Sequence, residues 1–531
     1  MALKTDDQFL ETQSDPSRRP GTPEWLEDPA VTPVNLREPQ REGIEERFSA
    51  SDPARCWELT RSPGVARLVR NRKFQFFLIL PNQLIFWTVI FVGFLGTAVP
   101  GLNFGAAITW YVWFCLVFVM MVVVGRAWCA MCPFGGFAEW VQRRSFWRRS
   151  QSALGLGLKF PEPLARYGFL LPVAAFLLLT WIEEFFNIAT PGTPSATSLM
   201  VVGIVASALI FFLVFERRTF CRYICPLNSL IATVGSMGSV AGFRTKDRDI
   251  CLSCKTKDCM RGGENGYGCP WYTWPGSADS NLYCGLCTEC YKACPEGNVG
   301  LFLQKPLTSV VAPKRRRIDV AWGIAFLWSL VLYQQVNATS AFAAADSWLN
   351  ANLHFPHYPD PAGYLGFITL GALATAAVAW LVAKGFASHA ISFARSGNFM
   401  DRTSRFRTYF APIAYGLIPV VGADYFARQL PKFLQSSPRV IPSVQHIFGF
   451  SGVHSPIYSF SIMTNGWIVF TQVAVIVLGT LGAAWTTWRI AERELVPISR
   501  NQLGVRVATL GFVLACGATA GVLYVIMHAA D

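Results

Sequence analysis

Charged residues are scarce in this chain. Asp, Glu, Lys and Arg make up 15% of the 531 residues, against roughly 25% in ordinary soluble domains. The chain also has no apolar segment behind a basic start at its N-terminus, so we expect no cleavable signal peptide. Hydrophobic residues make up 52% of the sequence, and the mean hydropathy is +0.34. This balance excludes an ordinary water-soluble enzyme.

Apolar runs recur along the chain, and about 20 such residues span the hydrocarbon core of a bilayer. We therefore predict an all-α polytopic membrane protein with about nine transmembrane helices. The seventh run contains Pro412, Pro419 and Asp424, so it is either a kinked span or a re-entrant element. The nine runs are Leu80–Val99, Phe104–Gly125, Leu164–Ile182, Leu199–Phe215, Ile318–Val336, Tyr364–Ala383, Tyr409–Tyr425, Trp467–Trp488 and Val507–Met527.

The formal charge of +13 is distributed unevenly between the connections. Residues 100–103, 183–198 and 337–363 contain no Lys or Arg, and residues 426–463 contain only Arg428, Lys432 and Arg439, whereas the alternate connections are rich in Arg with some Lys. By the positive-inside rule the basic loops and the N-terminus are cytoplasmic. The charge thus reflects topology in a bacterial inner (plasma) membrane. The expected partner is the lipid bilayer, and no nucleic acid is expected.

Two similar Cys-Pro motifs end the second and fourth apolar runs. The first is Cys129-x2-Cys132-Pro133 and the second is Cys221-x3-Cys225-Pro226. Because a residue before proline is pushed out of helical conformation, Cys132 and Cys225 should mark helix breaks at the membrane edge. The four thiols could form a third metal centre, act as redox thiols or be small buried residues. Nearby arginines, which would lower the thiol pKa values, favour the first two interpretations; they are Arg126, Arg217, Arg218 and Arg222.

The strongest motif lies between the fourth and fifth runs. Its spacing, Cys284-x2-Cys287-x2-Cys290-x3-Cys294-Pro295, matches the bacterial [4Fe-4S] ferredoxin run. Structural zinc is the alternative, but zinc normally takes paired C-x2-C units. A stretched version of the same run lies upstream, with ligand candidates Cys251, Cys254, Cys259 and Cys269.

In two-cluster ferredoxins the fourth cysteine of each run binds the other cluster. By this rule one [4Fe-4S] cluster is bound by Cys251, Cys254, Cys259 and Cys294, and the other by Cys269, Cys284, Cys287 and Cys290. The two fourth ligands could also be exchanged. A cysteine-rich and glycine-rich segment of this length cannot build a sizeable hydrophobic core, so metal must stabilise it.

These boundaries divide the chain into four regions. Residues 1–73 form a polar cytoplasmic tail, and residues 74–244 form a four-helix membrane core that carries both Cys-Pro motifs. Residues 245–312 form the small ferredoxin-like cytoplasmic insert. Residues 313–531 form a C-terminal membrane domain of about five helices.

Paired membrane-edge Cys-Pro motifs followed by a two-cluster insert resemble the membrane polyferredoxin family. This family includes NapH, the membrane core of NosR and CcoG, and the resemblance covers roughly residues 74–300. It implies electron transfer with a quinol or a partner redox enzyme. The first motif has two residues between its cysteines where these families typically have three, and the later spans lie outside the shared region.

We therefore expect a membrane-bound iron–sulfur electron-transfer protein that relays electrons between a quinone pool or cytoplasmic donor and a partner redox protein or respiratory enzyme. A redox protein that supports metal-cofactor assembly is the alternative, and a transporter dependent on Asp424 or Glu183 is a weaker one. No catalytic residue is predicted, and haem is disfavoured because no two histidines lie at matched depth in two helices. Polar side chains that could bind a quinone are Asn82, Gln83, Gln334, Gln335 and Asn337, and edge carboxylates on a candidate proton path are Glu183 and Glu184.

Overall fold

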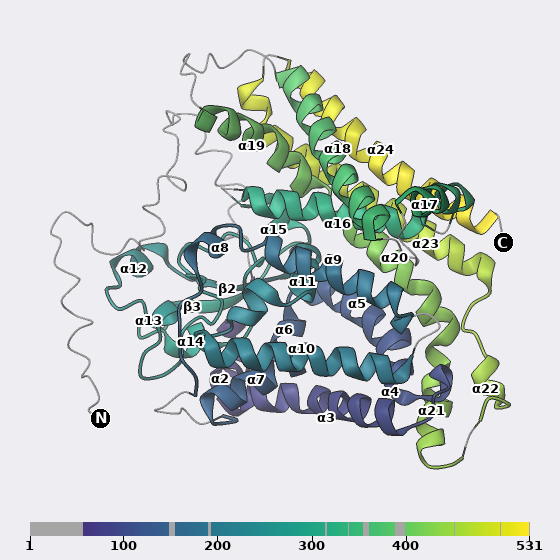
Figure 1. Ribbon diagram of the computed structural model, residues 1–531. Helices are drawn as coiled ribbons and strands as arrows, with labels where there is room; N and C mark the ends of the chain where they lie inside the picture. Colours follow the sequence, from purple (N-terminus) through teal and green to yellow (C-terminus); the bar gives the residue numbers. More distant parts are fainter. Residues whose placement is uncertain are drawn as a thin grey trace.

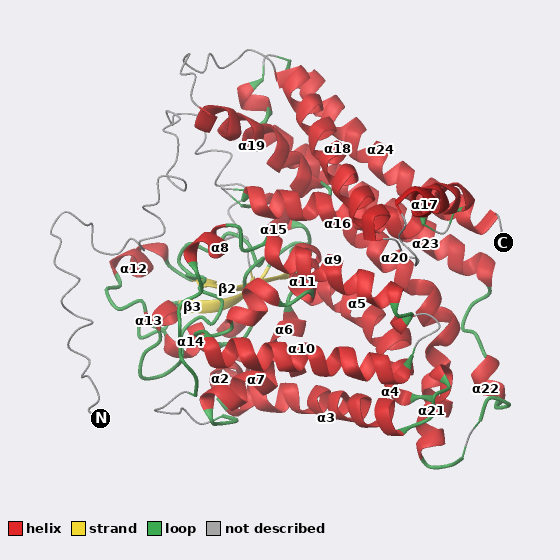
Figure 2. Cartoon of the chain, viewed as in Figure 1, coloured by secondary structure: helices red, strands yellow, loops and turns green. Residues whose placement is uncertain are grey.

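The computed structural model of the chain describes residues 57–147, 154–189, 193–313, 316–337, 339–353, 361–387, 399–450, 452–499 and 501–529. Helices dominate these residues, and a small sheet lies at one end of the molecule (Figure 2). The longer helices are α3 (Lys73–Leu95), α5 (Phe114–Val124), α7 (Pro133–Arg143), α9 (Leu170–Phe185), α10 (Pro194–Val214), α16 (Ile318–Val336), α17 (Ser340–Leu353), α18 (Pro361–Ala387), α19 (Phe399–Gly416), α20 (Ile418–Ser436), α23 (Asn465–Glu494) and α24 (Gln502–Ala529).

Shorter helices connect these elements and support the cysteines. They are α2 (Pro63–Arg70), α4 (Phe104–Ala107), α6 (Ala127–Met131), α8 (Glu162–Arg166), α11 (Leu227–Gly235), α12 (Arg248–Ser253), α13 (Asp258–Arg261), α14 (Glu289–Ala293), α15 (Thr308–Val311), α21 (Val440–Ile447) and α22 (Pro456–Ser459). Two π-helical turns, Ile108–Trp113 and Phe220–Ile224, interrupt the regular helices of the two halves of the membrane core.

Within the described residues, six helices are long and apolar enough to cross a membrane. A seventh crossing is added if Phe406–Gly416 and Ile418–Ile447, which meet at an angle of 41°, form one broken span. The break lies in the proline- and glycine-rich seventh run. The other two expected spans correspond to α9, which has only 16 residues, and α16, which has Asp319 near its start and Gln335 near its end. The count of nine spans is therefore not confirmed.

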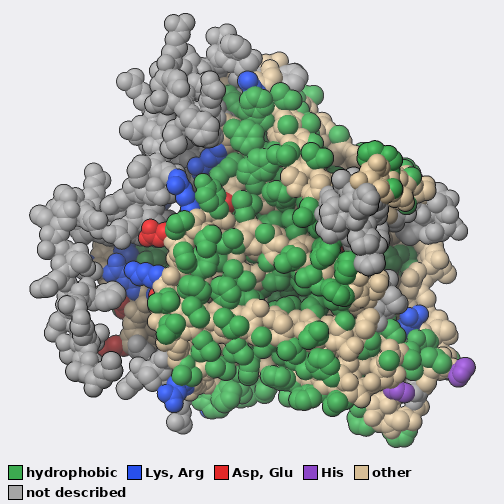
Figure 3. All heavy atoms as spheres, in the orientation of Figure 1, with side chains coloured by type: hydrophobic (Ala, Val, Ile, Leu, Met, Phe, Trp, Pro, Cys, Tyr) green, Lys and Arg blue, Asp and Glu red, His purple; other side chains and the backbone are tan. Residues whose placement is uncertain are grey.

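The surface fits a membrane environment. Figure 3 shows apolar side chains over most of the visible helical face, whereas Lys, Arg, Asp and Glu side chains gather mainly toward the end that carries the sheet. Large apolar side chains are exposed along several helices, including Leu84 on α3, Leu370 on α18 and Leu478 on α23. A broad exposed apolar surface of this kind is compatible with a membrane protein.

Three short antiparallel strands form the sheet, in the order β1-β3-β2. The strands are β1 (Trp57–Glu58), β2 (Val240–Thr245) and β3 (Val299–Leu303). Trp57 pairs with Leu303, and Thr245 pairs with Val299. The insert that contains the eight ferredoxin-type cysteines thus starts on β2 and returns on β3 (Figure 1). Residues 57–73, which we expected to belong to a polar tail, contribute β1 and α2 to this end of the molecule.

The main apolar core lies where α9, α11, α16 and α20 meet. Helix α11 follows the second Cys-Pro motif directly, and its Val234 lies against Gly422 of α20. Met237, just beyond α11, also contacts this glycine. The cysteine-bearing half and the C-terminal half are therefore packed against each other.

Candidate metal centres

The first group of insert cysteines surrounds the short helices α12 and α13. Cys251 lies within α12 and Cys254 at its end, Cys259 lies in α13, and Cys294 ends α14. Cys259 interacts electrostatically with the other three, and Cys251 interacts with Cys254 and Cys294. The chain thus brings Cys294 from the downstream run to the three cysteines of the upstream run.

The second group is buried more deeply. Cys290 interacts electrostatically with Cys269, Cys284 and Cys287, and Cys269 also interacts with Cys284. The upstream run therefore contributes Cys269 to the three closely spaced cysteines of the downstream run. Cys259 lies close enough to interact with both Cys269 and Cys290, so the two groups are neighbours.

Hydrogen-bond donors point at the sulfur atoms of both groups. The Asn298 side-chain amide donates to Cys251 Sγ (3.3 Å), and the backbone amides of Thr273 and Phe243 donate to Cys269 Sγ (3.4 Å) and Cys284 Sγ (3.5 Å). Hydrogen bonds of this kind stabilise thiolates and tune the potential of iron–sulfur clusters. The donors fit sulfur atoms that carry negative charge.

Gly242 lets the backbone of β2 approach the second group. Its φ is +91°, and a Cβ added there would lie 2.8 Å from Cys284 Sγ. An L-residue would therefore be strained in its backbone and would collide with the sulfur. The position needs glycine.

Buried cations without carboxylate partners lie beside the cysteines. Lys257 is 4% exposed, its Nζ has no hydrogen-bond partner, and it lies 4.1 Å from the ring centroid of Trp274. Arg126 is 1% exposed and lies over Trp271. Within the described residues neither cation has an ion-pair partner, and a buried unpaired charge is costly. Anionic thiolate-bound clusters in the adjacent groups would offset both charges.

The four membrane-edge cysteines form a third group. Cys221 interacts electrostatically with Cys129, Cys132 and Cys225, and Cys225 interacts with Cys129 and Cys132. Each cysteine that precedes a proline lies at the start of a helix, Cys132 before α7 and Cys225 before α11. The structure therefore brings both Cys-Pro motifs to one place.

Helix N-termini face this third group. Backbone amides of Phe134 and Gly135 hydrogen-bond to Cys132, and those of Leu227 and Asn228 hydrogen-bond to Cys225. The N-terminal end of a helix carries partial positive charge and favours anions. The same arrangement occurs in both motifs, so both are suited to stabilise thiolates.

Arg218 connects the third group with the second. It is 1% exposed, and it interacts electrostatically with Cys221 of the third group and Cys287 of the second. Its guanidinium donates to the Cys129 carbonyl (3.0 Å) and to Glu139 (2.5 Å). The three groups of four cysteines thus follow one another, from the outer part of the insert to the membrane edge.

Burial has a larger effect than the arginines on the pKa values of the membrane-edge thiols. Burial raises the pKa of Cys132 to about 11, and the opposing influence of Arg218 is smaller. Burial also raises the pKa of Cys259 to about 12. Arg218 lowers the pKa of Cys132 as expected, but desolvation outweighs its positive charge, so the net shift is upward.

The arrangement does not suit a single metal ion. Within the described residues, no three or more His, Cys, Asp or Glu side chains converge on a point that could hold one ion. A zinc ion needs its four ligands around one centre, whereas a cubane takes each cysteine at a different iron and so spreads the sulfur atoms. No disulfide joins the cysteines that the structure describes.

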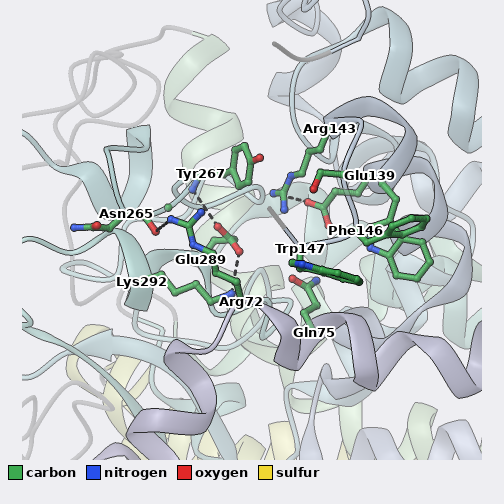
Figure 4. A pocket seen from close by; sticks show the side chains of 13 residues that line it. Arg72, Gln75, Glu139, Arg143, Phe146, Trp147, Asn265, Tyr267, Glu289 and Lys292 are labelled. Atoms are coloured by element: carbon green, nitrogen blue, oxygen red, sulfur yellow. Dashed lines mark hydrogen bonds and ion pairs between the residues drawn. The ribbon is translucent and has the colours of Figure 1, made fainter. Parts of the chain in front are cut away.

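A polar junction joins the insert to the membrane core (Figure 4). Glu139 pairs with Arg143 (2.7 Å), and Glu289, next to Cys290, pairs with Lys292 (3.2 Å) and accepts from the Tyr267 amide (3.0 Å). The cavity between them has a volume of about 30 Å³, enough for one or two water molecules. It is a packed joint and too small for an organic substrate.

The comparisons with known proteins point to the same residues. A family model described as a 4Fe-4S binding domain matches residues 106–151 and 197–242. These two segments are similar to 4Fe-4S binding domains. Each contains one complete Cys-Pro motif, so the match is consistent with a polyferredoxin-type protein. Neither the search of curated proteins nor that of solved structures found a match.

Several other candidate residues have different environments. With its amide oriented to satisfy its neighbours, Gln83 bonds the Pro133 carbonyl (3.2 Å) and the Trp87 indole (3.1 Å), so it supports the first Cys-Pro motif. Among the histidines, for which we expect no haem, His446 lies in the last turn of α21 and His454 in the loop before α22. His354, His357 and His389 lie outside the described residues.

Sequence reasoning missed Glu139, Asn228 and Trp271. Glu139 is a buried acid two turns after Cys132, and a carboxylate there could have been matched to one of the nearby arginines. Asn228 lies two residues after Pro226 and accepts a hydrogen bond from Arg126 (2.6 Å). Trp271 follows Cys269-Pro270 and is 1% exposed. No sequence pattern identifies the last two as partners of one arginine.

Proposed function

We propose that this chain is a membrane-bound iron–sulfur electron-transfer protein with three [4Fe-4S] clusters. Cys251, Cys254, Cys259 and Cys294 would hold one, Cys269, Cys284, Cys287 and Cys290 the second, and Cys129, Cys132, Cys221 and Cys225 the third. When bound, such clusters accept and donate single electrons. The observation that carries the proposal is the gathering of twelve cysteines into three successive groups of four.

The surrounding residues support this role. They bury five of the insert cysteines, donate hydrogen bonds to several sulfur atoms and place the unpaired cations of Lys257 and Arg126 beside them. The third group lies where the membrane helices end, which suits exchange with a membrane-soluble carrier such as a quinol or with a partner redox enzyme. We place the insert in the cytoplasm and the chain, with up to nine spans, in a bacterial inner membrane, on the basis of its charge distribution.

The test is iron and sulfide quantitation on the anaerobically purified full-length chain, combined with EPR of the reduced protein. Three clusters predict about twelve irons per chain, whereas the insert alone would account for about eight. Zinc in place of iron would overturn the proposal. Rapid oxidation of the dithionite-reduced clusters by a short-chain quinone would support the quinol as carrier.

Two glycine variants, one a matched control, test the ligands of the second cluster directly. Gly242→Ala should displace Cys284 Sγ and remove the second cluster, with a loss of about four irons. Gly297 also has a positive φ, +59°, but nothing lies within 4 Å of an added Cβ. Gly297→Ala should therefore keep the full iron content. Equal iron in both variants would argue against Cys284 as a ligand.

A further inference from the structure

A second polar region lies in the C-terminal membrane half, away from the cysteines. Asp424 on α20 is fully buried among apolar helices. Its Oδ1 accepts a hydrogen bond from the Gln335 amide on α16, but its Oδ2 has no partner. Gln335 Oε1 is also buried without a partner. The region therefore contains two buried oxygen acceptors, and the Tyr524 hydroxyl of α24 is the one other polar group that the described residues place against both side chains.

Within the part of the chain that the structure describes, no cation bonds the Asp424 carboxylate. Arg428 lies one turn further along α20, but its guanidinium donates to the Gln334 carbonyl (3.1 Å) and lies 3.9 Å from Glu184. Tyr524 on α24 donates to the Asp424 backbone carbonyl (3.3 Å). An ionised carboxylate in this position would be very costly, whereas a protonated one is neutral and can donate its O–H.

Polar side chains continue from Asp424 along one face of α20. Asp424, Arg428 and Lys432 are spaced by four residues and so lie on one side of the helix, over about 12 Å. Glu183 and Glu184, at the end of α9, interact electrostatically with Arg428 and Lys432. Asp424 is fully buried, whereas the side chains of Glu184 and Arg428 are 20% and 33% exposed, although both carboxylate oxygens of Glu184 are buried.

The opposite direction is closed by apolar packing. Ile418, Val420 and Val421 are each at most 2% exposed and lie between Asp424 and the bend at Leu417. Gly422 packs against Val234 and Met237 from the cysteine-bearing half. Asp424 is therefore connected by polar groups to the end of the bundle opposite the insert and separated from the insert end.

We propose that Asp424 is a proton-binding site within the membrane, reached from the end opposite the insert along Arg428, Glu184, Glu183 and Lys432. Tyr425 on α20 and Tyr524 on α24 are the other titratable groups beside it, with Tyr364 of α18 next to Tyr425. A metal cation suits the site less well, because hard cations take six or more oxygens and two unpartnered oxygens are present. The inference does not depend on the clusters.

The first experiment uses dicyclohexylcarbodiimide, which modifies protonated carboxyls in apolar surroundings, on the full-length protein in liposomes. Mass spectrometry of peptides should find the label on Asp424 in the wild-type chain and lose it in Asp424→Asn. Asp319 is the internal control, because it is equally buried but bonded to Arg317 (2.6 Å), and it should stay unlabelled. An unlabelled Asp424, or equal labelling of Asp319, would overturn the proposal.

A second experiment tests the access path and the identity of the ligand. Hydrogen–deuterium exchange of the Asp424 carboxylic acid, followed by its infrared C=O stretch, should be slower in Glu184→Gln. The exchange rate should be unchanged in Glu492→Gln. This control alters a carboxylate that is 40% exposed and lies in the last turn of α23, away from Asp424. Unchanged exchange in Glu184→Gln would refute the path. Protection of Asp424 from the carbodiimide by Na⁺ at constant ionic strength would show a cation site instead.

Discussion

The two Cys-Pro segments have similar local backbone conformations, but their buried arginines make different contacts. In the first, Gly125 has a φ of +69°, and in the second, Arg217 has a φ of +55°. In both, the next residue is a fully buried arginine, Arg126 or Arg218, three positions before the first cysteine of the motif. The common frame places one arginine from each segment at the centre of the site.

The partners of these two arginines differ. Arg218 crosses to the first segment, where it pairs with Glu139 and bonds the Cys129 carbonyl. Arg126 crosses to Asn228 of the second segment, bonds the Leu282 carbonyl and lies 4.3 Å from the centroid of the Trp271 ring. One arginine thus joins the two segments through a carboxylate, and the other joins them to the insert. The two copies of the motif thus connect to different parts of the molecule through corresponding arginines.

The largest expected effect tests whether the two segments share one metal centre. Cys129→Ser and Cys221→Ser should each lower the iron content by about four atoms per chain, because each removes one ligand of the same cluster. Cys115→Ser, a buried cysteine on α5 in the first segment, should leave the iron content unchanged. Iron and sulfide assays on anaerobic preparations would check this. Loss from only one of the two ligand variants would mean that the segments act separately.

Next in size is the loss of the carboxylate contact. Arg218→Gln should lower the free energy of unfolding by about 3–5 kcal/mol, because it leaves Glu139 buried without its shortest ion pair. Arg143 still contacts Glu139, so the lower end of this range is expected. The double variant Arg218→Gln/Glu139→Gln should recover part of the loss. Chemical denaturation in detergent would measure all three, and a double variant less stable than Arg218→Gln would contradict the explanation.

Arg126→Gln should have a smaller effect, about 2 kcal/mol, because it removes charge-assisted hydrogen bonds and a cation–π contact but strands no carboxylate. In addition, the insert should unfold locally more often in this variant, because its contact through the Leu282 carbonyl is lost. Limited proteolysis of the native protein should therefore cut the region around Leu282 faster in this variant than in Arg218→Gln. Equal cleavage rates would mean that the two arginines have the same role.

The smallest effect concerns the backbone before the arginine. Gly125→Ala should cost more than the roughly 1 kcal/mol of left-handed strain, because the added Cβ would lie 3.0 Å from Asn281 Nδ2 and 3.1 Å from the Gly235 carbonyl. Gly157→Ala is the matched control, since Gly157 has a φ of +59° and free space around it. Thermal unfolding should separate the two variants, and identical midpoints would show that only backbone strain matters.

Much of the site could be predicted because ligand spacing is a local property of the sequence. The runs ending in Cys269-Pro270 and Cys294-Pro295 gave the expected grouping of the insert cysteines, and the structure brings those same residues together. The ligand assignment itself stays a prediction. The partners of Arg126 and Arg218 could not be predicted, because they depend on how segments about 80 to 160 residues apart pack.

The long apolar helices were less predictable. Hydropathy locates long apolar helices such as α3 and α24, but α9 is too short and α16 is largely buried by its neighbours. The proline- and glycine-rich seventh run indicated a break, and the 41° bend between α19 and α20 lies there. Neither pattern could place Gln335 against Asp424, because that contact depends on the packing of α16 against α20.

The pairing of β1 with β3 can form only late in the synthesis of the chain. Trp57 and Thr60 precede α3, the first long apolar helix, yet they pair with Leu303 and Leu301 across some 240 residues. At ordinary translation rates of about 5–20 residues per second, the early strand waits roughly 12–50 s for its partner. By then the helices between β1 and the insert have been synthesised. The pairing of β1 with β3 can therefore form only after both Cys-Pro motifs and the whole insert have been synthesised.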